Sequence, residues 1–304
     1  MKYLEKHPLL IMAVGILGIS LSSIFIRYST APSAVTAAFR LLWTILLMTP
    51  VVLGKAEVRR EMRGLDRRSA LLSGLSGIFL AIHFLLWFES LRHTSVASAA
   101  TLVCTEVIWV SIGFCLFQGG RIPGKAVFAI SLALVGSVLI AWVDSGSGFH
   151  LYGDMLALMA SVAAAIYMLI GRTVQKPIST TVYTYIVYAA CGAVLVAVCG
   201  VGKLSLWGYG MGPVVIGALL AVFSTILGHS IFSWCLKFFS PSFVSAAKLC
   251  EPVVASILAV FLFGEVPTLM QLAGGILILG GLYAYSRVEG RKQYRTYKEK
   301  PPAE

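Results

Sequence analysis

The sequence predicts an all-α polytopic membrane protein in which ten transmembrane helices form two inverted-topology five-helix repeats. Three observations lead to this fold class: the composition, ten long apolar segments and an internal repeat. Of the 304 residues, 58% are hydrophobic and only 12% are charged, whereas a soluble domain carries roughly 25% charged residues. Together with a mean hydropathy of +0.88, this composition excludes a soluble globular fold.

Ten segments are apolar over the ~20 residues that an α-helix needs to cross the hydrocarbon core of a bilayer. The first is interpreted as a membrane helix and not as a signal peptide, because it is long and further apolar segments follow it. The predicted spans are residues 9–26, 33–53, 69–91, 95–117, 124–143, 151–171, 180–201, 213–236, 242–263 and 268–286.

Prolines mark the ends of these segments, since proline fits a helix start but breaks an interior turn. Of the eleven prolines, only Pro252 is predicted to lie inside a span. The prolines predicted at segment edges are Pro8, Pro32, Pro50, Pro123, Pro177, Pro213, Pro241 and Pro267.

The basic residues are distributed unequally between the two sides of the predicted helices. With a cytoplasmic N-terminus, 19 of the 24 Lys and Arg residues lie on the cytoplasmic side, and only Arg27, Arg92 and Lys203 lie on the other. Arg40 and Lys248 remain inside spans. This bias orients membrane proteins, so the net charge of +11 indicates topology and not nucleic-acid binding. We expect a multi-pass protein of the inner (plasma) membrane with both termini in the cytoplasm.

The two halves of the chain resemble each other. A shift of 147 residues aligns segment 87–102 with segment 234–249, matching Trp, Ser, Ser, Ala, Ala and Leu. A shift of 145 residues then pairs Glu106 with Glu251, Gly119 with Gly264 and Gly136 with Gly281.

Each repeat contains an odd number of helices, so the second copy enters the membrane from the opposite side. Inverted repeats of this kind are typical of transporters, whose substrate site lies between the halves. The predicted organisation is a first repeat at 1–146, a second at 147–286 and a basic cytoplasmic tail at 287–304. We expect the tail to be disordered or to lie on anionic lipid headgroups.

Five charged side chains fall within the predicted spans: Arg40, Glu89, Glu106, Lys248 and Glu251. Each costs roughly 2.5–3.5 kcal/mol at the centre of a bilayer on insertion scales. These side chains are therefore expected to face the protein interior or a water-filled cavity.

Lys248 and Glu251 are three residues apart on one helical face, where they can form a structural ion pair beside Pro252. The alternative is that Lys248 and Glu251 line a cavity and contact an anionic or zwitterionic substrate. Glu106 has two readings as well. It pairs structurally with a cation such as Arg40, or it remains unpaired and carries a coupled proton.

Two aromatic clusters recur in the two halves. His83 and Trp87 are four residues apart and share a helical face, and His229 and Trp234 lie at nearly corresponding places in the second half. These residues either pack between helices or form the wall of a substrate cavity. The substrate-binding candidates are Arg40, His83, Trp87, His229, Trp234, Lys248 and Glu251, with Glu106 as the proton-coupling candidate.

No cofactor or metal site is expected. The six cysteines fall in apolar stretches without a CxxC pair, and the sequence has no Walker lysine motif and no haem attachment motif. Transport would therefore draw on gradients or exchange and not on ATP.

Several stretches of the sequence resemble the drug/metabolite transporter superfamily of the EamA type, and the likeness covers essentially the whole chain. The segments that carry it are Ser22–Pro32 leading to Phe39-Arg40, His83–Trp87 with Ser90–Ser98, Gly228-His229 to Trp234, Glu251-Pro252 and Leu262–Glu265.

The resemblance implies ten helices in two inverted halves, cytoplasmic termini, a central cavity and export of amino acids, other metabolites or toxic compounds. Val107 stands where a proline is expected, and Ile19-Ser20-Leu21 replaces a common Trp-Gly pattern. A hinge is therefore not carried over to either place. Lys248 replaces a small or apolar residue, which suggests a role in specificity.

The predicted function is that of a secondary transporter and not of an enzyme. Its partners would be a small-molecule substrate, membrane lipids and, in one arrangement, a second copy of the chain. One alternative is a flippase for lipid-linked sugars. A remote alternative is an intramembrane serine hydrolase, because Gly74-Leu-Ser-Gly77 matches a protease pattern and His229 could act as a base.

Overall fold

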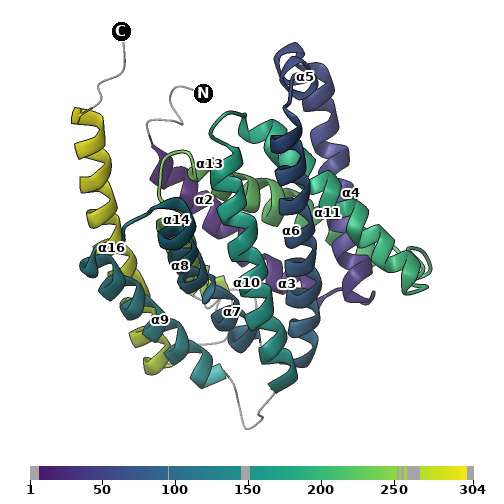
Figure 1. The fold of residues 1–304 in the computed structure, drawn as a ribbon. Helices are drawn as coiled ribbons and strands as arrows, with labels where there is room; N and C mark the ends of the chain where they lie inside the picture. Colours follow the sequence, from purple (N-terminus) through teal and green to yellow (C-terminus); the bar gives the residue numbers. More distant parts are fainter. Residues whose placement is uncertain are drawn as a thin grey trace.

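The protein is helical throughout its described length. The computed structural model describes residues 7–94, 96–144, 151–251, 253–254, 257–258 and 268–299, and no strand occurs among them. In Figure 1, the start of α2 (Pro8–Ser20), the short helix α5 (Ala56–Arg63) and the last turns of α16 (Leu269–Glu299) lie toward the same end of the molecule. This is the end to which the sequence assigned the cytoplasmic side.

The other helices follow in chain order. The first half contains α3 (Ser22–Arg27), α4 (Ser33–Gly54), α6 (Arg67–His93), α7 (Val96–Cys104), α8 (Glu106–Gln118) and α9 (Gly124–Asp144). The second half contains α10 (Leu151–Val174), α11 (Thr180–Val201), α12 (Gly212–Leu219), the π-helix η1 (Leu220–Ser230), α13 (Ile231–Cys235), α14 (Pro241–Ala247) and the 3₁₀ turn η2 (Lys248–Cys250).

Eight helical segments among the described residues are long and apolar enough to cross a membrane. They coincide with predicted spans, and α9 adds a shorter apolar stretch at Gly124–Leu139. An all-helical membrane protein is thereby confirmed. The predicted span 242–263 is described only in part, because Pro252 and residues 259–267, which include the Leu262–Glu265 motif, lie outside the described residues.

One boundary prediction was wrong. Pro50 lies inside α4, four residues before its end, and its missing N–H leaves the carbonyl of residue 46, one turn earlier, without its helical bond. For the tail, disorder was one of two expectations, and it is contradicted for residues 287–299, which continue α16 without interruption. Helix α16 thus extends beyond the end of its apolar stretch at Val288. The other expectation, contact with lipid headgroups, stays a prediction.

Several spans are interrupted at polar residues. The Ser20 hydroxyl donates to the Ile16 carbonyl at 2.8 Å, a back-bond that bends helices, and Leu21 separates α2 from α3. The fourth span breaks at Thr105, whose hydroxyl donates to the Leu102 carbonyl at 2.6 Å. The break therefore forms without the proline that Val107 replaces.

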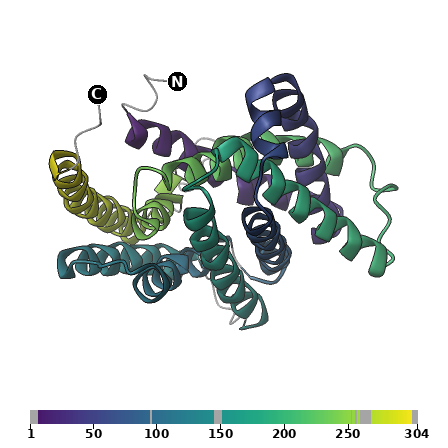
Figure 2. The same cartoon turned by 45° about the horizontal axis from the view of Figure 1, so that its top comes forward.

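The helices pack in pairs that join the two halves. Helix α6 contacts α10 and α11, α4 contacts α11 and α12, α9 contacts α16, and α2 contacts η1. Figure 2 shows α16 running beside the helices of the first half. The buried core therefore brings together residues that are far apart in the sequence.

The crossing of α2 and η1 depends on a glycine. A Cβ at Gly18 would lie 2.5 Å from the Phe223 carbonyl oxygen, so that backbone would have to move. We expect Gly18→Ala to lower the melting temperature by several degrees, because overpacking costs about 1–3 kcal/mol. Gly74→Ala is the matched control, since a Cβ there meets nothing within 4 Å. Equal melting temperatures for the two variants would contradict this account of the crossing.

Candidate functional site

Seven of the eight predicted site residues line one internal cavity. Its walls come from both halves of the chain: α2, α3, α4, α6, α7 and α8 from the first, and η1, α14 and η2 with Glu251 from the second. The predicted residues around it are Arg40, His83, Trp87, Glu106, His229, Lys248 and Glu251. The sequence distributed these residues over several apolar spans, and only the packing of the helices brings them together.

Lys248 and Glu106 form a buried ion pair across the two halves. The Lys248 Nζ donates to both carboxylate oxygens of Glu106, at 3.0 and 2.9 Å. The side chains are 12% and 5% exposed, so water screens their attraction little. The predicted pairing of Lys248 with Glu251 was therefore wrong. Glu106 has a structural cation partner, as one of its two readings expected, but that cation is Lys248 and not Arg40. The reading of Glu106 as unpaired was wrong.

Helix geometry brings the ion pair together. Glu106 is the first residue of α8, after the break at Thr105, and a carboxylate is stabilised at a helix N-terminus by the helix dipole. Lys248 begins the 3₁₀ turn η2 that ends α14. Its carbonyl accepts from the Cys104 thiol at 3.7 Å. Both partners thus lie where a membrane helix is interrupted.

Arg40 is 1% exposed and lines the cavity. Its Nε donates to the Thr225 hydroxyl at 2.7 Å, and its Cζ lies 4.1 Å from the centroid of the Phe84 ring, a cation–π contact. Its Nη2 is buried and has no hydrogen-bond partner among the described residues. This N–H is therefore a donor that a ligand in the cavity could bond.

Glu251 is the second charged group on the cavity without a bonded partner. It is 7% exposed, lines the cavity and has no hydrogen bond or ion pair within the described part of the chain. The cavity thus presents a guanidinium N–H and a carboxylate to which no described residue forms a hydrogen bond. The Ser224 hydroxyl, also on the cavity wall, is likewise buried without a described partner.

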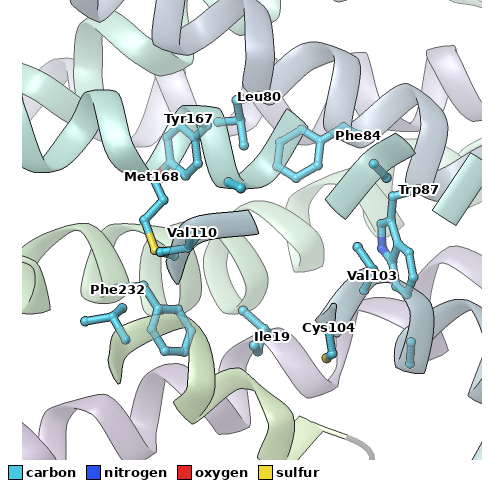
Figure 3. Close-up of a cluster of buried hydrophobic side chains, with 14 of the residues drawn as sticks. Ile19, Leu80, Phe84, Trp87, Val103, Cys104, Val110, Tyr167, Met168 and Phe232 are labelled. Atoms are coloured by element: carbon cyan, nitrogen blue, oxygen red, sulfur yellow. The ribbon is translucent and has the colours of Figure 1, made fainter. Parts of the chain in front are cut away.

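Aromatic rings form much of the remaining wall. Figure 3 shows Phe84 and Trp87 of α6, Val103 and Cys104 of α7 and Ile19 of α2 around a common centre. The rings of His83 and His229 have centroids 6.2 Å apart, so the two predicted clusters meet. The His83 Nδ1 is 3.0 Å from the Ala160 carbonyl and must carry the proton there, because a carbonyl only accepts.

Trp234, the eighth predicted site residue, and Glu89, a charged residue of the predicted spans, lie elsewhere. Trp234 does not line the cavity but packs against Phe238, with ring centroids 4.5 Å apart. Glu89 lies near the end of α6, where Ser33 donates to one carboxylate oxygen at 2.8 Å and His93 lies 3.0 Å from the other. The side chain of Glu89 is 39% exposed. It belongs to the end of the helix and not to the cavity.

Sequence reasoning missed Ser224 and Thr225, which lie on η1. In a π-helix, residues five apart share a face, and this places Ser224 near His229. The Thr225 hydroxyl accordingly donates to the Leu220 carbonyl, five residues earlier, at 3.2 Å. The only signal in the sequence was the presence of hydroxyl residues inside a predicted span.

The Gly74–Gly77 pattern is accounted for by packing. Ser76 Oγ lies 2.7 Å from the Tyr183 hydroxyl and 3.2 Å from the Tyr167 carbonyl. A Cβ at Gly77 would lie 2.5 Å from the Val187 carbonyl oxygen, so this glycine permits the close crossing of α6 and α11. A serine nucleophile requires a general base such as histidine or lysine in hydrogen-bonding reach, and neither of these partners of Ser76 is one.

The cavity is small. Its volume is about 50 Å³, room for about three or four water molecules, whereas pockets that bind drug-sized molecules measure roughly 300–1,000 Å³. The cavity as it stands therefore has room for water and not for a drug-sized molecule.

Sequence comparisons cover both halves of the chain. Residues 7–142 and 151–287 match the family model described as the EamA-like transporter family. A solved structure described as "Crystal structure of protein" has the same fold, with a TM-score of 0.75 at 18% identity, covering 94% of this chain and 98% of that one.

Curated relatives include transporters from several organisms. An uncharacterized transporter of Archaeoglobus fulgidus is 28% identical over 93% of this chain and 99% of its own. The pseudopaline exporter CntI of Pseudomonas aeruginosa is 24% identical, covering 76% of this chain and 80% of its own. A protein named "Probable amino-acid metabolite efflux pump" of Salmonella typhimurium is 29% identical, covering 66% and 71%.

Proposed function

This chain belongs to the EamA-like transporter family, as its resemblance predicted, and from that premise we propose that it exports small metabolites such as amino acids or related compounds. The observation that carries the proposal is the cavity between the halves, where Arg40 Nη2 and the Glu251 carboxylate both lack a bonded partner in the described structure. Relatives named as exporters support the direction of transport.

The cavity residues take separate roles in this proposal. Arg40 Nη2 and the Ser224 hydroxyl donate to a substrate carboxylate, and Glu251 accepts from a substrate ammonium group. Charge-assisted hydrogen bonds of this kind fix orientation as well as affinity. His83, Trp87 and His229 border the apolar part of the substrate. Lys248, held by Glu106, lies within the same wall and limits which substrates fit.

Alternating access would proceed by movement of two inverted repeats, residues 1–146 and 147–286, around the cavity. Two observations support this. The family model matches twice along the chain, and the shift of 145 residues that pairs Glu106 with Glu251 places Thr105 opposite Cys250. The fourth span breaks at Thr105, and η2 ends at Cys250.

The proposed location is the inner membrane, with both termini and α5 in the cytoplasm. The excess of Lys and Arg on that side, 19 against 3, supports this orientation. Helix α5 carries Arg59, Arg60 and Arg63 in a stretch outside the apolar spans that buries none of its residues, as a cytoplasmic segment would.

A two-step experiment tests the proposed function. The melting temperature of detergent-purified protein is measured across amino acids and related metabolites, since a ligand that binds only the folded state raises it. Compounds that stabilise are then assayed for counterflow in proteoliposomes. Stabilisation followed by counterflow supports the proposal. A flat screen and no counterflow would overturn it and favour a lipid-linked substrate.

The two tryptophans provide a matched test of where the substrate binds. Trp87→Ala removes a cavity wall and is expected to weaken binding of a stabilising metabolite roughly 10-fold or more. Trp234→Ala removes the same side chain from a site outside the cavity, so affinity should stay within about two-fold. His83→Ala and His229→Ala should weaken binding without preventing membrane insertion. Equal losses of affinity in the two tryptophan variants would contradict the assignment of this cavity.

A further inference from the structure

A second hollow lies apart from the central cavity, between the start of α9 and the last apolar turns of α16. It has a volume of about 490 Å³ and is lined by Gly124, Lys125, Phe128, Ala284, Arg287 and Val288. Nothing in the proposed transport mechanism uses it. We name this hollow the α9–α16 groove.

The groove forms where two tightly packed helices separate. A Cβ at Gly136 would lie 2.5 Å from the Gly274 carbonyl oxygen, and one at Gly281 would lie 2.6 Å from that of Ala129. These pairs show that α9 and α16 run antiparallel and nearly touch. At Gly124, about one turn beyond, a Cβ meets nothing within 4 Å. The space between the helices is therefore open at this end.

The groove carries positive charge from both helices. Lys125 and Arg287 both line it, and none of the six lining residues is acidic. Neither cation has an ion-pair partner within the described residues. The N-terminus of α9 at Gly124 adds the positive end of a helix dipole. An anion in this groove would thus meet two side-chain cations and a helix terminus.

The groove also has an apolar part, and it lies at a membrane boundary. Phe128 is 69% exposed, and Ala284 and Val288 line the groove beside it. The apolar stretch of α16 ends at Val288, next to Arg287. Charge at the boundary and apolar surface toward the membrane interior match the headgroup and the acyl chains of a lipid.

We propose that the α9–α16 groove binds an anionic phospholipid, with its phosphate between Lys125 and Arg287 and its first acyl carbons against Phe128. A free phosphate ion would use only the charged part of the groove. A zwitterionic lipid would place its own cation beside Lys125 and Arg287. In the proposed orientation the lipid belongs to the cytoplasmic leaflet, where anionic lipids gather.

The experiment compares lipids that differ only in headgroup charge. Delipidated protein in a non-ionic detergent is titrated with short-chain phosphatidylglycerol or phosphatidylcholine, and binding is followed by melting temperature and by native mass spectrometry. Phosphatidylglycerol should bind at least ten-fold more tightly. The double variant Lys125→Gln/Arg287→Gln should reduce that preference by roughly 10- to 30-fold, from about 1 kcal/mol per cation.

A matched control removes two cations elsewhere on the same side. The double variant Arg67→Gln/Arg68→Gln replaces two exposed arginines at the start of α6 and should keep the preference. Three outcomes would overturn the proposal: equal binding of the two lipids by the unmodified protein, equal loss in both double variants, or stabilisation of the same size by inorganic phosphate. The comparison of the two lipids uses the unmodified protein and needs no variant. If Lys125→Gln/Arg287→Gln does not fold, the single variant Lys125→Gln replaces it. Metabolite counterflow is not part of the readout, so failure here leaves the proposed transport function untouched.

Discussion

Lys248→Met is expected to lower the free energy of unfolding by roughly 3–5 kcal/mol and to abolish transport, the largest effect we expect from one substitution. Methionine leaves the carboxylate of Glu106, 5% exposed, without the ammonium that now lies 2.9 Å away. Removing one partner of a buried ion pair is costly because the remaining charge stays desolvated. Denaturation of purified protein and counterflow in proteoliposomes measure the two effects.

The control is the double variant Lys248→Met/Glu106→Gln. Glutamine keeps the shape of Glu106 but carries no charge, so the double variant should recover most of the lost stability. A double variant as unstable as Lys248→Met would contradict the energetic role of the pair. The reading in which Glu106 stays unpaired and carries a coupled proton loses its premise, because both carboxylate oxygens accept from Lys248.

Arg40→Gln is expected to weaken binding of a stabilising amino acid by about 10- to 150-fold, since hydrogen bonds to charged groups contribute roughly 1.5–3 kcal/mol. The reason is the loss of Nη2, which has no described protein partner and is assigned to the substrate carboxylate. Glu251→Gln should cause a loss of similar size through the substrate ammonium group. Both are measured by thermal titration of the purified variants.

Substrate analogues separate these two roles from a general loss of fold. The Arg40→Gln variant should bind an amino acid and its amide, which lacks the carboxylate, equally well, and should still bind the amino acid more tightly than the deamino acid. The Glu251→Gln variant should show the opposite pattern. It should bind the amino acid and the deamino acid equally well, and should still bind the amino acid more tightly than the amide. If either substitution lowers the affinity for all three compounds by the same factor, the assignment of Arg40 to the carboxylate and of Glu251 to the ammonium group of the substrate is wrong.

Much of the fold could be predicted because the membrane leaves few options. Backbone N–H and C=O groups in hydrocarbon must be bonded within the segment, so long apolar runs become helices, and eight of the predicted spans appear as such. The end of α16 could not be predicted in this way. Its residues from Arg287 to Glu299 are mostly polar, and polarity alone does not distinguish a helix from a disordered tail.

The interruptions of the helices could not be predicted from the sequence either. Thr105 ends α7 through its own hydroxyl bond to Leu102, which competes with the regular helical pattern. The sequence of the π-helix η1 is that of an ordinary apolar segment, and in the structure η1 packs against α2. Glycines such as Gly18 permit that packing, but the sequence does not predict which helix packs against them.

The sequence by itself determined the helical membrane fold and the set of charged residues expected to avoid lipid, because both follow from the cost of polar groups in hydrocarbon. Its motifs carried the resemblance to the family. The tertiary structure alone decided which charges pair. Lys248 lies three residues from Glu251 yet bonds to Glu106, 142 residues away. A spacing of three residues allows two side chains on one helix to approach each other. Where the helix is broken, however, the helices packed around it determine the direction in which each side chain points. That packing leaves Arg40 Nη2 and Glu251 on the cavity without described partners of their own.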